Sequence, residues 1–328
     1  MTATILRAGF LSSVQDRGRV GHRQSGVSIG GALDPHALNV ANLLVGNEVS
    51  SAGIEATLGH LRIRFNDERL IAWAGGAFSV RVKDLDLPAG RSAWVRRGEE
   101  LFVAAPENRA RAWIAISGGI DLPSVLGSRS TDLRNHFGGL EGRALRDNDV
   151  IALGSPHASA ADIARKIGDA RIASWGAPSE WVSTTPLHAF LRVVRGADWS
   201  RFEGTDPASL VQQTFTVTSH ADRMGIRLDG FPLDRLSTDE IVSEAVTPGT
   251  IQVPPDGRPI LLLGDCQTIG GYPKIAHVIT VDLPAAAQLR PGDLVRFAEV
   301  PLAEAQRLFV ERERDLQRFR IGLSLQTS

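Results

Sequence analysis

The sequence contains a single cysteine, Cys266, and its 36 basic residues nearly balance its 37 acidic ones. One cysteine cannot close an intrachain disulfide, so a reducing, cytoplasmic setting is the simplest expectation. A net charge near zero gives no field that would attract nucleic acid or an anionic membrane. No run reaches the roughly 18 apolar residues that span a bilayer, and Arg7 and Gly9 break the short N-terminal apolar patch, unlike a signal peptide. We therefore expect no nucleic acid and no membrane as partners.

Several well-known catalytic motifs are also missing. The sequence has no GxxxxGK(S/T) phosphate loop, no HExxH and no GxSxG, and its 8 histidines show no metal-ligand spacing. We therefore expect no metal site, whereas the missing phosphate loop does not exclude ATP. Covalent biotin is not expected on this chain, because the only lysines, Lys83, Lys166 and Lys274, lack the methionine neighbours of a biotinylated turn.

Short runs rich in valine, isoleucine and phenylalanine recur along the chain, with glycine or proline between them. Apolar and polar residues alternate in LRIRF (61–65) and TFTVT (214–218), which is typical of half-buried strands. The continuous run ILLL (260–263) is typical of a strand buried on both faces. We therefore predict a mainly β protein, built as sandwiches or barrels, with a few helices.

Two segments predict helices. In segment 33–47, Asp34 is placed to cap the N-terminus, Pro35 suits the first turn and Gly46 suits the exit. Segment 302–320 carries apolar residues at roughly helical spacing and is densely charged elsewhere. We expect the charged face of this second helix to meet solvent rather than a partner.

The length of the chain favours two domains of about 100–200 residues each. Alanine, serine, threonine and proline dominate its middle, which is typical of a linker. We predict an N-terminal domain over 1–160, a linker over 161–190 and a C-terminal domain with the helix over 191–328. ALRDNDVIAL (144–153) and QLRPGDLVRF (288–297) close the two halves in a similar way, a faint sign of duplication.

The segment GDCQTIGGYPK (264–274) follows a predicted buried strand and is rich in glycine and polar groups. Cys266 is either an exposed nucleophile or a small residue that fills a strand end, and we favour the second interpretation. Gly270 and Gly271 either bring backbone N–H groups onto a ligand oxygen or form a plain turn. Glycine is combined with polar residues in the same way at 13–34, 125–143 and 219–230.

These segments in their order, together with IEATLGHLRIRF (54–65) and the run 243–297, resemble the allophanate hydrolase subunit 2 family, also called the biotin-dependent carboxyltransferase family. Its freestanding bacterial members are known as the C-type subunit of ATP-hydrolysing 5-oxoprolinase. The resemblance implies two cyclophilin-like β-barrel domains. It also implies two protein partners, a B-type subunit (the allophanate hydrolase subunit 1 protein) and a third oxoprolinase subunit.

The resemblance implies a subunit of a hydrolase that couples ATP hydrolysis to opening of the 5-oxoproline lactam, which gives glutamate. In urea amidolyase the corresponding region is fused to biotin carboxylase, carboxyltransferase and biotin-carrier parts, which this sequence lacks, and this favours the oxoprolinase role. Two alternatives stay open: a carboxyltransferase component of a biotin-dependent urea or allophanate system, and a non-catalytic regulatory protein that binds the B-type subunit. ATP is the expected cofactor, at a site on the partner or shared with it.

Negative charge develops on the lactam or phosphoryl oxygens in this reaction, so fixed N–H donors and cations are needed. We predict Lys274, Gln267 and Tyr272 as catalytic residues, with Lys274 as the cation. For Asp34, a helix cap without further duty is the stronger interpretation. The predicted substrate-binding residues are Thr268, Gly270, Gly271, Asp16, Arg19, Gly30, Gly31, Asp34, Ser128, Arg129 and Arg223.

The chain departs from the family pattern at four positions in these segments. Ala221, Ile226, Cys266 and Ile269 stand where typical members carry more polar residues. The arginine that is missing at position 266 weakens the expectation that this loop binds an anion, and it leaves room for a different cyclic amide as substrate.

Overall fold

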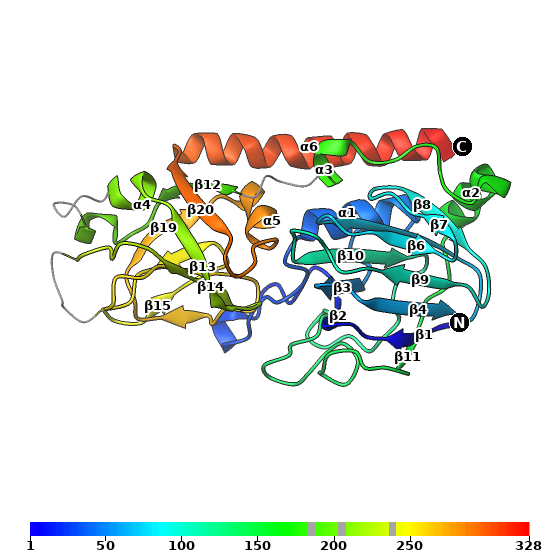
Figure 1. Ribbon diagram of the computed structural model, residues 1–328, viewed down its shortest axis with the longest axis horizontal. Coiled ribbons are helices and arrows are strands. Elements are labelled where there is room, and N and C mark those ends of the chain that lie inside the picture. Colours follow the sequence, from blue (N-terminus) through cyan, green and yellow to red (C-terminus); the bar gives the residue numbers. More distant parts are fainter. Residues whose placement is uncertain (183–187, 203–207, 236–240, 328) are drawn as a thin grey trace. The chain divides into compact units, whose positions relative to one another are not determined.

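The alternation in LRIRF is realised in the computed structural model, which describes residues 1–182, 188–202, 208–235 and 241–327 (Figure 1). Strand β4 (Leu61–Phe65) buries its three apolar side chains and exposes the two arginines between them. The chain forms two units, each built from segments far apart in the sequence. The first comprises Met1–Arg19, Asp34–Thr184 and Arg314–Ser328, and the second comprises Val20–Leu33 and Thr185–Glu313.

Two antiparallel sheets enclose the core of the first unit. Their strand orders are β11-β1-β4-β9-β6-β7 and β2-β3-β10-β5-β8. Besides β4, the first sheet contains β11 (Val150–Ala152), β1 (Thr2–Arg7), β9 (Glu100–Val103), β6 (Val80–Val82) and β7 (Leu85–Asp86). The second contains β2 (Leu11–Gln15), β3 (Gly53–Thr57), β10 (Arg111–Ile116), β5 (Arg69–Gly75) and β8 (Ser92–Val95). Ile5, Ile63 and Ile114 belong to the apolar cluster that these sheets share.

Helix α1 (Pro35–Leu44) covers the other side of the second sheet, which explains why β10 is buried along its whole length. Ala115 of β10 packs with Val40 and Leu44 of α1 in a second apolar cluster. The predicted cap is confirmed, because the Asp34 carboxylate accepts a hydrogen bond from the Ala37 N–H at 2.8 Å.

The cap gives a first testable prediction. We expect Asp34→Ala to lower the free energy of unfolding by about 1 kcal/mol, because the first turn of α1 loses its side-chain acceptor. Asp34→Ser keeps a capping oxygen and removes the charge, so it should retain most of the stability. Chemical denaturation of both variants measures the difference. An equal loss in the two would show that the carboxylate has a role beyond the cap.

The segment predicted as a linker, 161–190, is instead structured up to Val182. It contains most of α2 (Ala158–Ile167), a 3-10 turn and α3 (Ser179–Val182), and it belongs to the first unit. Positions 183–187 lie outside the described residues. This stretch is rich in small and polar residues, so its composition indicates a linker. Its few apolar residues are nevertheless spaced three and four apart, which is the spacing of one buried helix face. The buried side chains of α2 are Ala160, Ile163 and Ile167, which cluster with Leu316 and Leu323.

Two other segments also correct the predicted boundaries. Val20–Leu33 belongs to the second unit although it was predicted within 1–160, and Arg314–Ser328 belongs to the first unit although it was predicted within 191–328. Position in the sequence cannot reveal which unit such a segment joins, because the unit is determined by the residues against which the segment packs.

The second unit contains a closed barrel in the order β12-β19-β16-β17-β14-β13-β20. These strands are β12 (His188–Arg195), β19 (Lys274–Val278), β16 (Thr250–Gln252), β17 (Ile260–Leu262), β14 (Gly225–Asp229), β13 (Phe215–Ala221) and β20 (Leu294–Glu299). Phe215 and Phe297 meet inside the barrel with ring centroids 5.7 Å apart. Two short helices, α4 (Ala208–Gln212) and α5 (Leu283–Ala286), accompany it. The predicted class, mainly β with few helices, is confirmed, although the strands of the first unit form two sheets.

The predicted C-terminal helix is confirmed as α6 (Leu302–Thr327). Its charged face is exposed and carries short-range ion pairs, such as that of Arg307 with Glu311 at 2.7 Å. Leu316 is buried, whereas Leu302, despite its helical spacing, is exposed. No helix in the described ranges has both the length and the apolarity needed to cross a bilayer.

Candidate functional site

The loop GDCQTIGGYPK of the second unit begins at a buried ion pair. The Asp265 carboxylate accepts two hydrogen bonds from Arg223, at 2.8 Å from Nε and 2.9 Å from Nη2. Both side chains are more than nine-tenths buried. The same Nη2 also donates to the Gly31 carbonyl at 2.6 Å, and the Gly30 N–H donates to the Gly264 carbonyl at 3.1 Å. Arg223, Gly30 and Gly31 therefore fix the start of the loop to the segment Val20–Leu33.

A second ion pair fixes the end of the loop. Lys274 Nζ lies 2.6 Å from Glu244 Oε2 and 3.5 Å from Asp198 Oδ2. Burial alone would lower the pKa of Lys274, but its hydrogen bond to Glu244 and the nearby Asp198 raise this pKa above its ordinary value. The predicted cation is thus charged and buried, and two carboxylates of the same unit neutralise it.

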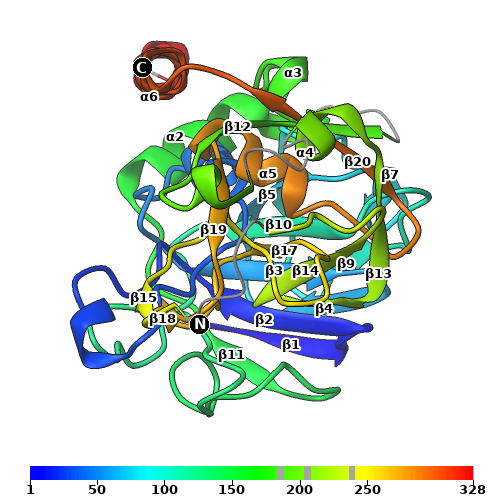
Figure 2. The ribbon, with the colours of Figure 1, turned by 90° about the vertical axis from the view of Figure 1, so that its left-hand side faces the viewer.

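Between these anchors the loop forms a small ribbon (Figure 2). β18 (Ile269–Gly270) pairs with β15 (Glu244–Ala245). A Cβ added at Gly270 would come within 2.7 Å of Gln252 Nε2, so a larger residue at that position would displace the Gln252 side-chain amide. Gly270 therefore packs against the Gln252 side chain, and the Thr268 carbonyl accepts a hydrogen bond from the Val246 N–H.

Cys266 is fully buried, in agreement with the interpretation that it fills a strand end. Burial raises the pKa of its thiol to about 11, although the nearby Arg23 acts in the opposite direction. A thiol that is inaccessible and protonated at neutral pH is a poor nucleophile.

Thiol labelling tests this directly, because the chain has only this cysteine. We expect 5,5′-dithiobis(2-nitrobenzoate) to modify the native protein at pH 8 at least about 100-fold more slowly than the protein unfolded in denaturant, since the thiolate is both rare and covered. The Cys266→Ala variant should lose no more than about 1.5 kcal/mol of its free energy of unfolding. Rapid labelling of the native protein would contradict the assignment.

A concavity of about 570 Å³ lies against the outer face of the barrel, beside this loop. Its polar lining includes Gln252, Gln267, Tyr272, Asp222 and Arg227. Gln252 lies at the centre of this polar set: its side-chain amide donates to the Tyr272 carbonyl at 3.1 Å, and its oxygen lies 3.4 Å from Gln267 Nε2. The lining drawn from the described residues includes Gln267 and Tyr272, as predicted, but neither Lys274 nor Gly270.

Strand register explains why these residues meet. Arg227 pairs with Ile260, Ile260 pairs with Gln252, and Gln252 pairs with Lys274, so the four form one row across β14, β17, β16 and β19. Arg227 points outward because Ile226 and Leu228, on either side of it, are buried in the barrel. Sequence reasoning did not select Gln252 or Arg227; the signal was a polar residue between two apolar neighbours, Ile226 and Leu228 for Arg227 and Ile251 and Val253 for Gln252.

Four of the predicted residues of the first unit come together around Asp16: Asp16 itself, Arg19, Ser128 and Arg129. The Asp16 carboxylate accepts hydrogen bonds from the Ser128 hydroxyl at 2.5 Å, the Ser130 hydroxyl at 2.6 Å and the Arg129 N–H at 2.6 Å. Arg19 donates to the Ser130 carbonyl. Asp16 therefore holds the segment 128–130 in place, and its oxygens are occupied by that task.

Arg129 directs its guanidinium along the same surface segment. Its Nε donates to the Leu122 carbonyl at 2.7 Å, and its Nη2 lies 3.4 Å from Asp121. Asp16, Arg19, Asp34, Ser128 and Arg129 belong to the first unit, whereas all other predicted site residues belong to the second. That the two sets form one site stays a prediction.

A buried polar cluster of the first unit was not anticipated. Glu55 of β3 is almost fully buried, and it accepts a hydrogen bond from the Trp113 indole at 2.9 Å. The Arg111 guanidinium lies 3.7 Å from the same carboxylate. Glu55 lies inside IEATLGH, where alternation with Ile54 and Ala56 could have marked it as a polar residue on a covered sheet face.

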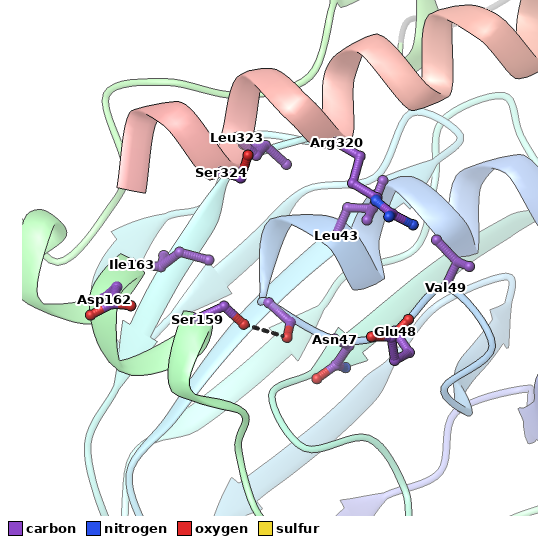
Figure 3. A pocket seen from close by; sticks show the side chains of 11 residues that line it. Leu43, Asn47, Glu48, Val49, Ser159, Asp162, Ile163, Arg320, Leu323 and Ser324 are labelled. Atoms are coloured by element: carbon purple, nitrogen blue, oxygen red, sulfur yellow. Dashed lines mark hydrogen bonds between the residues drawn. The ribbon is translucent and has the colours of Figure 1, made fainter. Parts of the chain in front are cut away.

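The first unit has a concavity of its own, of about 400 Å³, between the end of α1, α2 and the last turns of α6 (Figure 3). Leu43, Ile163 and Leu323 form its apolar floor. Much of its polar lining is used for structure: the Ser159 hydroxyl donates to the Gly46 carbonyl at 2.9 Å, and the Asn47 amide donates to the Ile116 carbonyl. The concavity of the second unit is therefore the better candidate for recognition of a small polar ligand.

No group of three or more histidine, cysteine, aspartate or glutamate side chains in the described ranges is arranged to hold a metal ion. What the second unit offers is amide, phenol and guanidinium groups around a solvent-accessible hollow. Such groups suit a small polar molecule that is itself rich in carbonyl and N–H groups.

A protein with this fold and site falls into a known class: the chain belongs to the carboxyltransferase domain family, subdomain A and B, whose profile matches residues 25–299. Among its relatives is the C-type subunit of 5-oxoprolinase from Escherichia coli K12, 37% identical over 94% of this chain and 95% of the relative. The protein of the same name from Haemophilus influenzae is 33% identical over 96% of this chain and 97% of its own length.

Among solved structures, the urea amidolyase of K. lactis superposes with a TM-score of 0.88 at 27% identity. The match covers 97% of this chain but only 20% of that much longer protein. The whole chain therefore corresponds to one part of the urea enzyme, and the fold described here is shared between the two kinds of relative.

Proposed function

We propose that this chain is the C-type subunit of an ATP-dependent 5-oxoprolinase, which opens the lactam of 5-oxoproline to give glutamate. The observation that carries the proposal is the end-to-end similarity to two proteins named as this 5-oxoprolinase component, at 37% and 33% identity. On this proposal the chain works in the cytoplasm with a B-type subunit and a third subunit.

The lactam carbonyl is a poor electrophile because amide resonance stabilises it. Phosphoryl transfer from ATP to the lactam oxygen, with ADP as the leaving group, is the activation that the assembled enzyme would supply. Water would then add to the carbon, and the ring C–N bond would break as the nitrogen takes up a proton, which leaves an acyl phosphate. A second water would release inorganic phosphate and glutamate. The residues of this chain fit a cyclic amide better than a triphosphate, because the described lining of the concavity includes one guanidinium and no lysine. We therefore assign ATP binding to the partner subunits.

The task of this chain would then be to bind and orient the lactam. The side chains of Gln252 and Gln267 both present an amide N–H donor and a carbonyl acceptor. A lactam carries the complementary pair, one C=O and one N–H, on adjacent ring atoms. Because Gln252 is buried and held by the Tyr272 carbonyl, its amide is a fixed rather than a mobile partner.

Reconstitution tests the proposal. The chain is co-purified with its B-type partner and the third subunit, and ATP hydrolysis is measured with 5-oxoproline and with urea. We expect ATP hydrolysis that depends on 5-oxoproline and is accompanied by stoichiometric glutamate. Activity with urea alone, blocked by avidin, would refute the proposal.

That second outcome corresponds to the other candidate, a carboxyltransferase component of a biotin-dependent urea system. The family description and the superposition on urea amidolyase favour it specifically. Both reactions place negative charge on an oxygen of an amide or ureido group, so the same amide-lined concavity would serve either.

A further inference from the structure

We propose that Arg227 is the carboxylate-binding residue of the second unit and that it selects small cyclic amides that carry a carboxylate. This inference rests on the proposed function and adds to it the residue that recognises the carboxylate of the substrate. 5-Oxoproline has a lactam and a carboxylate on one five-membered ring, whereas urea has no charged group. A site that takes the first and rejects the second therefore needs a cation at a fixed distance from its amide-binding groups.

The concavity contains such an arrangement. Arg227 and Gln252 lie in the same cross-strand row, with Ile260 between them. Neighbouring strands are about 4.8 Å apart, so residues two strands apart are separated by roughly 10 Å at the backbone. Arg227, Ile260 and Gln252 all line the concavity of about 570 Å³, which is larger than one small ring.

The charge of Arg227 is available for a ligand. In the described part of the chain Arg227 makes no ion pair, and the nearby Asp229 instead pairs with Arg258 at 3.3 Å. Asp222 also lines the concavity, but its carboxylate accepts hydrogen bonds from the Met224 N–H at 2.7 Å and the Gly225 N–H at 3.1 Å. Arg227 is therefore the arginine of the described lining, and it forms no ion pair with a carboxylate there.

This assignment gives different roles to the two cations at the ends of the row, Arg227 and Lys274. Lys274 is buried and neutralised by Glu244 and Asp198, so it positions the loop that carries Gln267 and Tyr272. Arg227 faces the concavity and can form a bidentate contact with a carboxylate, which is the geometry that guanidinium groups favour.

The test compares two substrates that differ only in the carboxylate, 5-oxoproline and 2-pyrrolidinone, on the reconstituted complex. For Arg227→Gln we expect the KM for 5-oxoproline to rise by about 10- to 100-fold with little change in kcat, because a charge-assisted contact is lost. Arg227→Lys should restore part of the affinity. Any ATP hydrolysis with 2-pyrrolidinone should be unchanged by either variant. Arg258→Gln, which removes an exposed arginine from the same region, is the matched control and should behave as wild type.

An unchanged KM for 5-oxoproline in Arg227→Gln, or an equal effect on both substrates, would overturn the inference while leaving the proposed function standing. Saturation-transfer NMR on the same complex provides a readout that does not need turnover. Arg227-dependent binding of 5-oxoproline without turnover would support the inference and refute the proposed function. Absence of both binding and turnover in the wild-type complex would refute both.

Discussion

Replacing Arg223 with alanine is expected to lower the free energy of unfolding by about 3–5 kcal/mol. The loss arises because Asp265 would keep its buried position without the guanidinium that neutralises it, and an unpaired charge in a covered site is strongly unfavourable. The hydrogen bond to the Gly31 carbonyl is lost as well. Denaturant titration followed by tryptophan fluorescence and circular dichroism measures the change.

The exposed pair of Arg258 with Asp229 provides the control. Both of its side chains are more than half exposed, so Arg258→Ala should cost no more than about 1 kcal/mol. Replacing Arg223 and Asp265 together by methionine and leucine should recover much of the stability, because the stranded charge disappears with its partner. If Arg223→Ala cost as little as Arg258→Ala, the pair would not anchor the loop as described.

The second large effect is expected at Lys274. We predict that Lys274→Ala lowers 5-oxoproline-dependent ATP hydrolysis by the reconstituted complex by about 100-fold or more, while the protein stays folded. Removing the ammonium leaves Glu244 and Asp198 without their shared cation, so the β15–β18 ribbon loses an ion-pair attachment to the barrel and Gln267 and Tyr272 are held less firmly. Steady-state kinetics measures the loss of turnover, and circular dichroism checks that the variant stays folded.

A partner variant distinguishes positioning from direct participation of the lysine. Glu244→Gln keeps the lysine but weakens its attachment, so a positioning role predicts a clear loss of turnover in this variant too. If Lys274 instead contacted the substrate as a free cation, releasing it from Glu244 would preserve or raise the activity. Wild-type turnover in Lys274→Ala would refute both roles.

Local features of the sequence predicted local features of the structure well. Asp34 and Gly46 marked the two ends of α1, because capping depends on residues that are near neighbours in the chain. The favoured interpretation of Cys266, a small residue that fills a strand end, agrees with its complete burial. The segment 161–190 was wrongly predicted to be a linker, because its composition is dominated by alanine and serine and its apolar residues are few.

The roles of the charged residues could not be read from the sequence in the same way. Lys274 was predicted as a catalytic cation, and its carboxylate partners, Asp198 and Glu244, lie 76 and 30 positions away in the chain, so local sequence does not reveal the pairing. Arg227 and Gln252 meet only through strand register, which depends on how β14, β17 and β16 pair. The sequence therefore predicted the polar loop 264–274 but not Arg227, the cation that lines the concavity of the second unit.

The threading of Val20–Leu33 into the second unit has a practical consequence for dissecting this protein. Among the attachments of that segment are three hydrogen bonds: Arg23 to the Val246 carbonyl, Gly30 to the Gly264 carbonyl, and Arg223 to the Gly31 carbonyl. A C-terminal fragment that starts near residue 185 would lack all three hydrogen bonds. During synthesis, residues 20–33 must wait for these hydrogen-bond partners until Gly264 has left the ribosome. The barrel should therefore be expressed alone only with residues 20–33 grafted onto it, and no single cut in the chain separates the protein into two self-sufficient halves.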